Sequence, residues 1–334
     1  MEASTKRRNK MQSKNSKTYE LVLTALFVAI IIAMALTPLG YIPLVVINAT
    51  TLHIPVIIGS IFLGPKKGAF LGGVFGVTSL IKSSVQATSL SSFVFSPIAA
   101  LHMLPHDSVG AAIIIVLKSV FIPVFPRVMI GVVPFFVFVG IKKMMSSKLK
   151  TVYGTILNAA VSFILGFGVY ELFNGLITKG KLGEGLFFKF INEGDAITEG
   201  IKTSFVQDEV TYWINVYNSG VVFPKIVGAV FGILVLIAIE VLFMKKDAKT
   251  LAFTTAGVAG ALTNTLLVMG SIFVLYNAQY AAAVGVDPSK LMAFIGTVIS
   301  FNGVIEAVVS AIIVYLVGIV LDKIHPAGIV AGKN

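Results

Sequence analysis

Long apolar runs, separated by short polar or basic segments, dominate the sequence. A helix needs about 20 residues to cross a hydrocarbon layer of about 30 Å, and several of these runs reach or approach that length. The pattern predicts an all-α, polytopic membrane bundle with eight spans. The apolar segments are 21–36, 51–64, 68–81, 119–141, 151–177, 223–244, 251–276 and 291–321.

Basic residues cluster between these runs and predict the side of the membrane on which each loop lies. Short loops rich in Lys and Arg stay on the cytoplasmic side. The lysines that follow alternate spans therefore place both termini inside. Residues 1–18 form a basic cytoplasmic tail, which we expect to be disordered, and 325–334 form a short inner tail. The inner lysines are Lys66, Lys67, Lys142, Lys143, Lys148, Lys150, Lys245, Lys246, Lys249 and Lys323.

The composition excludes several other classes of protein. Hydrophobic residues make up 56% of the 334 residues and charged residues 12%, which leaves too little polar surface for a water-soluble enzyme. The net charge of +11 is spread over many loops rather than gathered in one patch, so we expect no nucleic-acid partner. Because the chain has no cysteine, disulfides and thiolate metal sites are excluded.

Motifs for ATP hydrolysis and for peptide or ester hydrolysis are missing. The sequence has no P-loop, since the lysines after Gly64-Pro65 lack the required spacing and the following Ser or Thr. It also has no H-E-x-x-H and no G-x-S-x-G motif. We therefore expect a protein that is not an enzyme and has no cofactor, and any ATP must be hydrolysed by another subunit.

Two outer loops differ from the others. Residues 83–110 are unusually apolar for a loop, so we expect this segment on or in the mouth of the bundle. Residues 178–222, approximately, hold six of the 15 acidic side chains and predict a polar external loop.

Small residues recur at every fourth position in two predicted spans, and each set therefore shares one helix face. The two stripes are Ala25, Ala29 and Ala33 in the first span and Gly68, Gly72 and Gly76 in the third. Small side chains let another helix approach closely. For the glycines we expect packing within the chain. The alanines fit either packing within the chain or contact with a partner helix.

Arg127 is the most informative charged residue. It lies about eight residues, or roughly 12 Å, from the outer end of the predicted span 119–141. An uncompensated cation at this depth costs several kcal/mol. The guanidinium group therefore either pairs with Glu306 or snorkels to the surface, or it holds the carboxylate of a ligand through two hydrogen bonds.

Polar residues of two later spans lie at a similar depth. Asn302 and Glu306 are four residues apart and share a helix face, and Asn264 belongs to the preceding span. Polar side chains that hold helices together are one explanation. Their convergence with Arg127 favours a site for a small polar organic ligand, open to the outside.

The segment between the first two spans carries Asn48 and His53, which can add a lid or a side wall to this site. A helix N-cap by Thr50 or Thr51 explains the same segment equally well.

Several of these sequence blocks resemble one known family. The blocks are the alanine stripe, Leu39-Gly40-Tyr41-Ile42-Pro43, Asn48-Ala49-Thr50-Thr51-Leu52-His53, Leu63-Gly64-Pro65-Lys66-Lys67-Gly68, Pro126-Arg127-x-x-x-Gly131, Leu262-Thr263-Asn264-Thr265 and Asn302-Gly303-Val304-Ile305-Glu306. They cover about 1–145 and 250–325. Together they are similar to the substrate-binding S component of an energy-coupling factor (ECF) transporter, above all to its pantothenate-type branch. Members for riboflavin or folate share the helix plan.

This resemblance implies a six-helix core in a bacterial-type plasma membrane that binds a vitamin from the outside. The core would comprise 19–145, with four helices, and 250–324, with the last two. Residues 146–249 depart from the family pattern and add a helical hairpin. The partners would be membrane lipid, a transmembrane T component and two cytoplasmic ATPase subunits, with the T component meeting Ala25, Ala29 and Ala33.

The leading hypothesis is therefore a pantothenate-binding subunit in which Arg127 meets the carboxylate and Asn264 and Asn302 take the hydroxyl or amide groups. Glu306, Asn48 and His53 complete the candidate site. One rival is a membrane assembly protein without transport function. Another rival is an ion-coupled secondary carrier with Glu306 as its proton site.

Overall fold

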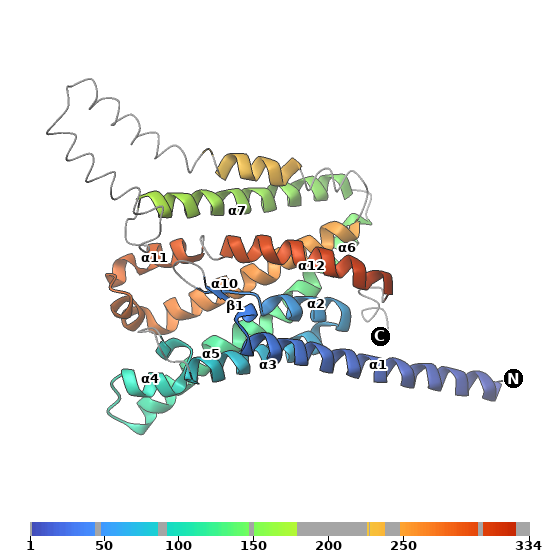
Figure 1. The fold of residues 1–334 in the computed structure, drawn as a ribbon, viewed down its shortest axis with the longest axis horizontal. Helices are drawn as coiled ribbons and strands as arrows, with labels where there is room; N and C mark the ends of the chain where they lie inside the picture. The colour runs from blue at the N-terminus through green and yellow to red at the C-terminus, as the bar shows by residue number, and fades with distance from the viewer. Residues whose placement is uncertain are drawn as a thin grey trace, which may run out of the picture.

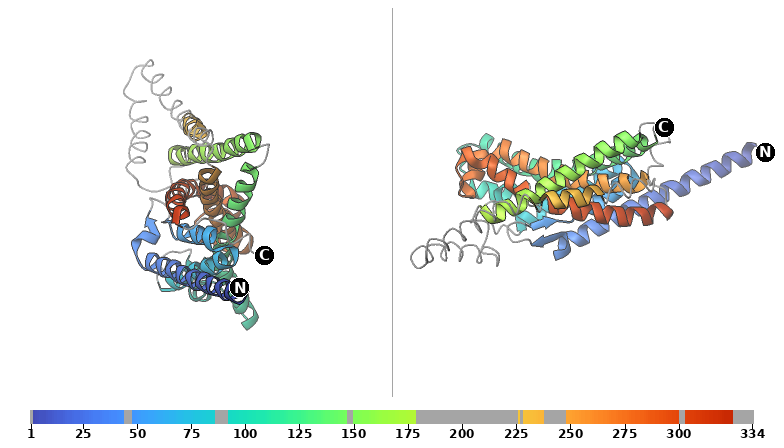
Figure 2. Two further views of the ribbon diagram at one scale, coloured as in Figure 1. Left: turned by 90° about the vertical axis from the view of Figure 1, so that its right-hand side faces the viewer. Right: turned by 90° about the horizontal axis from the view of Figure 1, so that it is seen from above.

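The computed structural model of the chain is a bundle of helices. The described residues are 2–43, 48–85, 92–146, 150–178, 226, 228–237, 248–299 and 303–324. Most of the long helices run along a common direction, with α1 (Glu2–Leu36) and α7 (Lys150–Thr178) on opposite faces of the bundle (Figure 1, Figure 2). The predicted helical class is thus confirmed for the described residues.

Five described segments are long and apolar enough to cross a membrane: Thr18–Leu36, Pro65–Val85, Val109–Met145, Ala248–Ala283 and Val304–Ile324. Each overlaps a predicted span. In the three other predicted spans the apolar helical stretches are shorter: His53–Leu63, Val152–Phe167 within α7, and Gly228–Ile237. The count of eight spans and the cytoplasmic position of both termini stay predictions.

The predicted span 51–64 is too long, because only α2 (His53–Leu63) is helical there. Its 11 residues rise about 16 Å, roughly half of the hydrocarbon thickness. All 11 are buried, so α2 is a short inner helix surrounded by others. The chain before it forms the 3-10 turn η1 (Pro38–Gly40) and the strands β1 (Tyr41–Pro43) and β2 (Asn48–Thr50).

The two strands form an antiparallel hairpin that the hydrophobic pattern did not predict. Tyr41 pairs with Thr50 and Pro43 with Asn48. Three-residue strands carry too few alternating positions for a period-2 signal. The hairpin contacts α12 (Val304–Ile324), which places a loop of the N-terminal half on the last helix.

The basic tail is helical, contrary to the expected disorder, because α1 begins at Glu2. Residues 2–36 contain neither glycine nor proline, and several are strong helix formers. The tail and the first span therefore form one continuous helix (Figure 1).

The glycine stripe packs within the chain, as predicted. It lies on α3 (Pro65–Val85) and faces α5 (Val109–Ile130). A Cβ atom on Gly72 would overlap the Arg127 carbonyl group, and one on Gly76 would lie 2.9 Å from Val124 Cα. Only glycine allows the two backbones to come so close.

A break after α5 separates it from α6 (Val133–Met145). The Ser60 hydroxyl of α2 donates a 2.6 Å hydrogen bond to the Gly131 carbonyl at this break. A Cβ atom on Gly131 would overlap the Gly68 backbone, so the start of α3 fills the same place.

Helix α10 (Ala248–Ala283) lies at the centre and packs against α12, α6, α5 and α2. It is kinked at Tyr276, whose φ and ψ of −136° and 31° are not helical. After the turn η3 (Pro288–Lys290), the predicted last span is divided into α11 (Leu291–Val298) and α12.

The part of the outer segment 83–110 around Phe93 is buried in the bundle, which agrees with its apolar composition. The segment contains η2 (Ser92–Val94) and α4 (Pro97–Met103). Phe93 and Val94 are buried, and the Phe93 carbonyl accepts a 2.9 Å hydrogen bond from the Ser119 hydroxyl of α5.

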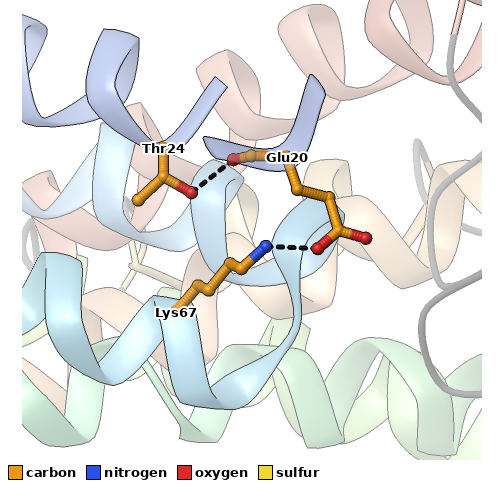
Figure 3. A network of polar contacts seen from close by, with 3 residues as sticks. All are labelled: Glu20, Thr24 and Lys67. Atoms are coloured by element: carbon orange, nitrogen blue, oxygen red, sulfur yellow. Dashed lines mark hydrogen bonds and ion pairs between the residues drawn. The ribbon is translucent and has the colours of Figure 1, made fainter. Parts of the chain in front are cut away.

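Ion pairs join helices near the lysine-rich ends of the bundle. Lys67 of α3 binds Glu20 of α1, and the Thr24 hydroxyl donates to the Glu20 carbonyl at 2.6 Å (Figure 3). Lys249 of α10 pairs with Asp322 of α12. These pairs fix the relative height of the helices that they join.

The described part of the predicted insertion consists of α7 and the helix Gly228–Ile237. These two helices approach closely at glycines, since a Cβ on Gly166 would lie 2.9 Å from the Gly228 carbonyl oxygen. Helix α7 contacts α6, α11 and α12, and it lies away from α1 (Figure 2).

Candidate functional site

Glu306 anchors the β-hairpin to the last helix. Its side chain is buried, and its Oε1 atom accepts hydrogen bonds from the Thr50 N–H at 2.9 Å and the Thr50 hydroxyl at 3.0 Å. Its Oε2 atom accepts from the Thr265 hydroxyl at 3.0 Å. Three donors thus solvate a carboxylate that burial would otherwise destabilise.

Helix capping does not explain the two threonines. The N-cap of α2 is Leu52, and no side chain caps this end. Thr50 instead binds Glu306, and the Thr51 hydroxyl donates to the Leu39 carbonyl. The hairpin is therefore held by tertiary contacts.

His53 and Asn264 carry buried polar atoms with unfilled hydrogen-bonding capacity. His53 is only 1% exposed, and neither ring nitrogen makes a hydrogen bond of normal geometry among the described residues, although the Thr50 backbone lies beside the ring. Asn264 donates from Nδ2 to the Thr50 hydroxyl at 3.5 Å, while its Oδ1 atom has no such partner there. Buried polar atoms are nearly always paired, and an unpaired one costs about 1–3 kcal/mol. Such atoms mark a place where a ligand can supply the missing bonds.

Arg127 is buried on α5, and the proline before it helps to position it. Pro126 has no N–H group, so it cannot donate to the Ile122 carbonyl four residues earlier. Arg127 Nη1 donates to this carbonyl at 3.3 Å. The guanidinium carbon lies 5.4 Å from the ring centroid of Phe75 and 5.8 Å from that of Phe95, over both ring faces.

Arg127 and Glu306 belong to one region without forming an ion pair. The hydrogen bonds of Glu306 come from Thr50 and Thr265, and neither ion pair found among the described residues includes Glu306. His53 lies within electrostatic range of both Glu306 and Arg127. The cationic group and the anionic group of the site are therefore held by different contacts.

The side chains of two predicted site residues are not described by the structure. Asn302 is outside the described residues, and Asn48 is placed only by its position on β2. The residues that the structure does bring together are His53, Arg127, Asn264 and Glu306.

Four further residues belong to this region: Thr50, Thr265, Phe75 and Phe95. Thr265 lies directly after Asn264, so the polar run in an apolar span could identify it from the sequence. Nothing in the local pattern distinguishes Phe75 and Phe95 among the 25 phenylalanines of the chain.

The alanine stripe faces away from the bundle. Ala25, Ala29 and Ala33 are exposed, whereas Phe27 and Ile31 of the same helix are buried against the core. Packing within the described part of the chain therefore does not use the stripe. Helix α1 presents a smooth, apolar face that another helix can approach.

Comparisons with known proteins gave two relatives. The chain is 34% identical over 160 residues to the pantothenic acid transporter PanT of Lactococcus lactis subsp. cremoris, a match that covers 46% of this chain and 77% of the relative. It is 40% identical over 105 residues to the pantothenate transporter PanT of Leuconostoc mesenteroides subsp. mesenteroides, covering 30% of this chain and 50% of that relative. No protein-family model matches the chain. No solved structure matches it.

Proposed function

Because the chain belongs to the PanT family of pantothenate transporters, we propose that it is the substrate-binding membrane subunit of an ATP-driven importer of the ECF type, with pantothenate as its ligand. The missing P-loop supports a division of labour in which other subunits hydrolyse ATP. These subunits are a transmembrane T component and two cytoplasmic ATPases. The T component docks on the face formed by Ala25, Ala29 and Ala33.

The charges of the site support one orientation of the ligand. Pantothenate carries a single carboxylate, which binds the guanidinium group of Arg127. The carboxylate of Glu306 repels the carboxylate of the ligand, which therefore points away from Glu306. The hydroxyl and amide groups of the ligand then reach His53, Asn264 and Asn302. Asn48 lies in the hairpin that closes over them.

The observation that carries this proposal is the state of His53. The ring is 1% exposed, neither nitrogen makes a hydrogen bond of normal geometry, and the Thr50 backbone, a cation and an anion lie around it. This environment suits a polar ligand with one charge. A protein in which these polar groups only hold helices together would satisfy both nitrogens internally.

The lysine-rich helix ends support uptake from the outside. The ends of α3, α6, α10 and α12 that carry Lys67, Lys142, Lys249 and Lys323 are the cytoplasmic ends by the positive-inside rule. We place both chain termini on that side, and eight spans in total.

A binding screen tests the proposal. Purified protein in detergent or nanodiscs, without ATP, is titrated with labelled pantothenate, and riboflavin and folate are used as competitors. We expect saturable binding that only unlabelled pantothenate displaces. Saturable binding of riboflavin or folate, with none of pantothenate, would overturn the substrate assignment.

The rival function as an ion-coupled carrier predicts a different result. Glu306 is the carboxylate that such a carrier would use, but both of its oxygens already accept hydrogen bonds from Thr50 and Thr265. Vesicles that contain this protein alone should therefore show no pantothenate uptake in response to a pH gradient. Gradient-driven uptake by the protein alone would replace the importer proposal.

A further inference from the structure

We propose that Phe75 and Phe95, the aromatic pair, are specificity-determining residues that make Arg127 selective for a carboxylate over a neutral group. This inference rests on the proposed function, because it concerns how the same site recognises its ligand. The two phenylalanines would set the selectivity through their contact with the guanidinium group.

The glycine stripe brings Phe75 to Arg127. Gly72 lets α3 approach α5 at the Arg127 carbonyl group, and Phe75 follows three residues later on the same helix. The Phe75 ring is fully buried, and its face lies 5.4 Å from the guanidinium carbon. The ring thus keeps water away from the part of the guanidinium group that it covers.

The outer segment brings Phe95 to the same group. Phe95 lies between η2 and α4, and both ends of this turn are tied down. The Ser119 hydroxyl donates to the Phe93 carbonyl at 2.9 Å, and the Ser96 hydroxyl donates to that of Ser84 at 3.0 Å. The half-buried Phe95 ring is therefore presented to Arg127 by a constrained loop.

The chemistry of the guanidinium group explains the selectivity. Its faces attract aromatic rings, whereas its N–H groups point outward in the plane and match the two oxygens of a carboxylate. One nitrogen, Nη1, is already oriented by the Ile122 carbonyl. Where rings exclude water, the attraction between the N–H edge of the guanidinium group and an anion is stronger than in a hydrated site. A neutral hydroxyl group gains much less from the same environment.

The test compares pantothenate with pantothenol, in which a primary alcohol replaces the carboxylate. The Phe95→Leu variant keeps an apolar side chain but removes the ring. We expect the Kd for pantothenate to rise about tenfold and that for pantothenol to change less than about twofold. The Phe95→Tyr variant keeps the ring face and should retain the selectivity of the wild type.

Phe93→Leu is the matched control, because Phe93 lies in the same segment but packs edge-on against Tyr276, at 5.3 Å between centroids. Its effect on the two ligands should be equal. Phe75→Leu provides a second variant from another helix and should lower the selectivity as Phe95→Leu does.

If Phe95→Leu and Phe75→Leu weaken the binding of both ligands equally, or change neither, the aromatic pair has no role in selectivity. The proposal that the protein binds pantothenate would still stand. A wild-type protein that binds neither compound would instead overturn the proposed function, and this inference with it.

Discussion

Thr50 and Glu306 are 256 residues apart in the chain, and both donors of Thr50, the backbone N–H and the hydroxyl group, bind the same carboxylate oxygen of Glu306. This contact joins the hairpin after the first helix to the last helix. Since Asn264 also donates to the Thr50 hydroxyl, three distant segments meet at one side chain. The hairpin is therefore held in its place only when the whole bundle has assembled.

Removing the Thr50 hydroxyl should weaken this closure. The Thr50→Val variant keeps the backbone N–H bond to Glu306 and the size of the side chain, but it loses the hydrogen bond from the hydroxyl group. A hydrogen bond to a charged group contributes about 1.5–3 kcal/mol. We expect faster pantothenate dissociation in a stopped-flow or filter assay. Thr37→Val, which removes an exposed hydroxyl bond to the Met34 carbonyl, is the control. Unchanged dissociation in Thr50→Val would contradict a closing role for the hairpin.

Arg127→Gln should weaken pantothenate binding by about 2–5 kcal/mol, the range for truncating one side of a buried charged pair. Because Thr50 and Thr265 support Glu306, a second change of Glu306→Gln should not restore either affinity or thermal stability. Calorimetric titrations and melting curves of both single variants and the double variant measure this. Rescue by Glu306→Gln would mean that Glu306 is the anion that Arg127 needs.

Gly72→Ala should destabilise the fold and weaken ligand binding together, because its Cβ atom would overlap the Arg127 carbonyl group and push α3 from α5. Overpacking of this kind costs about 1–3 kcal/mol. Gly73→Ala is the matched control, since nothing lies within 4 Å of its added Cβ atom, and alanine favours a helix. Thermal unfolding in detergent should separate the two variants, and equal melting temperatures would count against close backbone packing at Gly72.

Ala29→Leu should abolish association with the T component and ATP-dependent uptake, while pantothenate binding by the isolated subunit stays unchanged. The added volume separates α1 from a partner helix but faces away from the ligand site. Ile30→Phe enlarges another exposed side chain, about 100° further around α1, and should leave association intact. Copurification with the T component reports the first effect, and equal loss of binding and association would point to misfolding of α1.

Properties that depend on neighbours in the chain were predictable from the sequence. The glycines of α3 indicated close packing within the chain, and the structure has it against α5. The intramembrane charges of Arg127 and Glu306 stood out because hydrocarbon tolerates a charge only with specific support. The lengths of the apolar runs predicted the five segments that are long enough to cross a membrane, because the length of an apolar run depends on no tertiary contact.

Tertiary structure decided which of these groups meet and what supports them. The sequence allowed an ion pair between Arg127 and Glu306, but the hairpin and α10 provide the hydrogen bonds of Glu306, and two rings from separate segments face Arg127. The alanines of α1 could have faced inward or outward, and the packing of Phe27 and Ile31 turned them out. Periodicity places residues on one face of a helix, but the direction of that face is fixed only when all helices compete to bury their apolar surface.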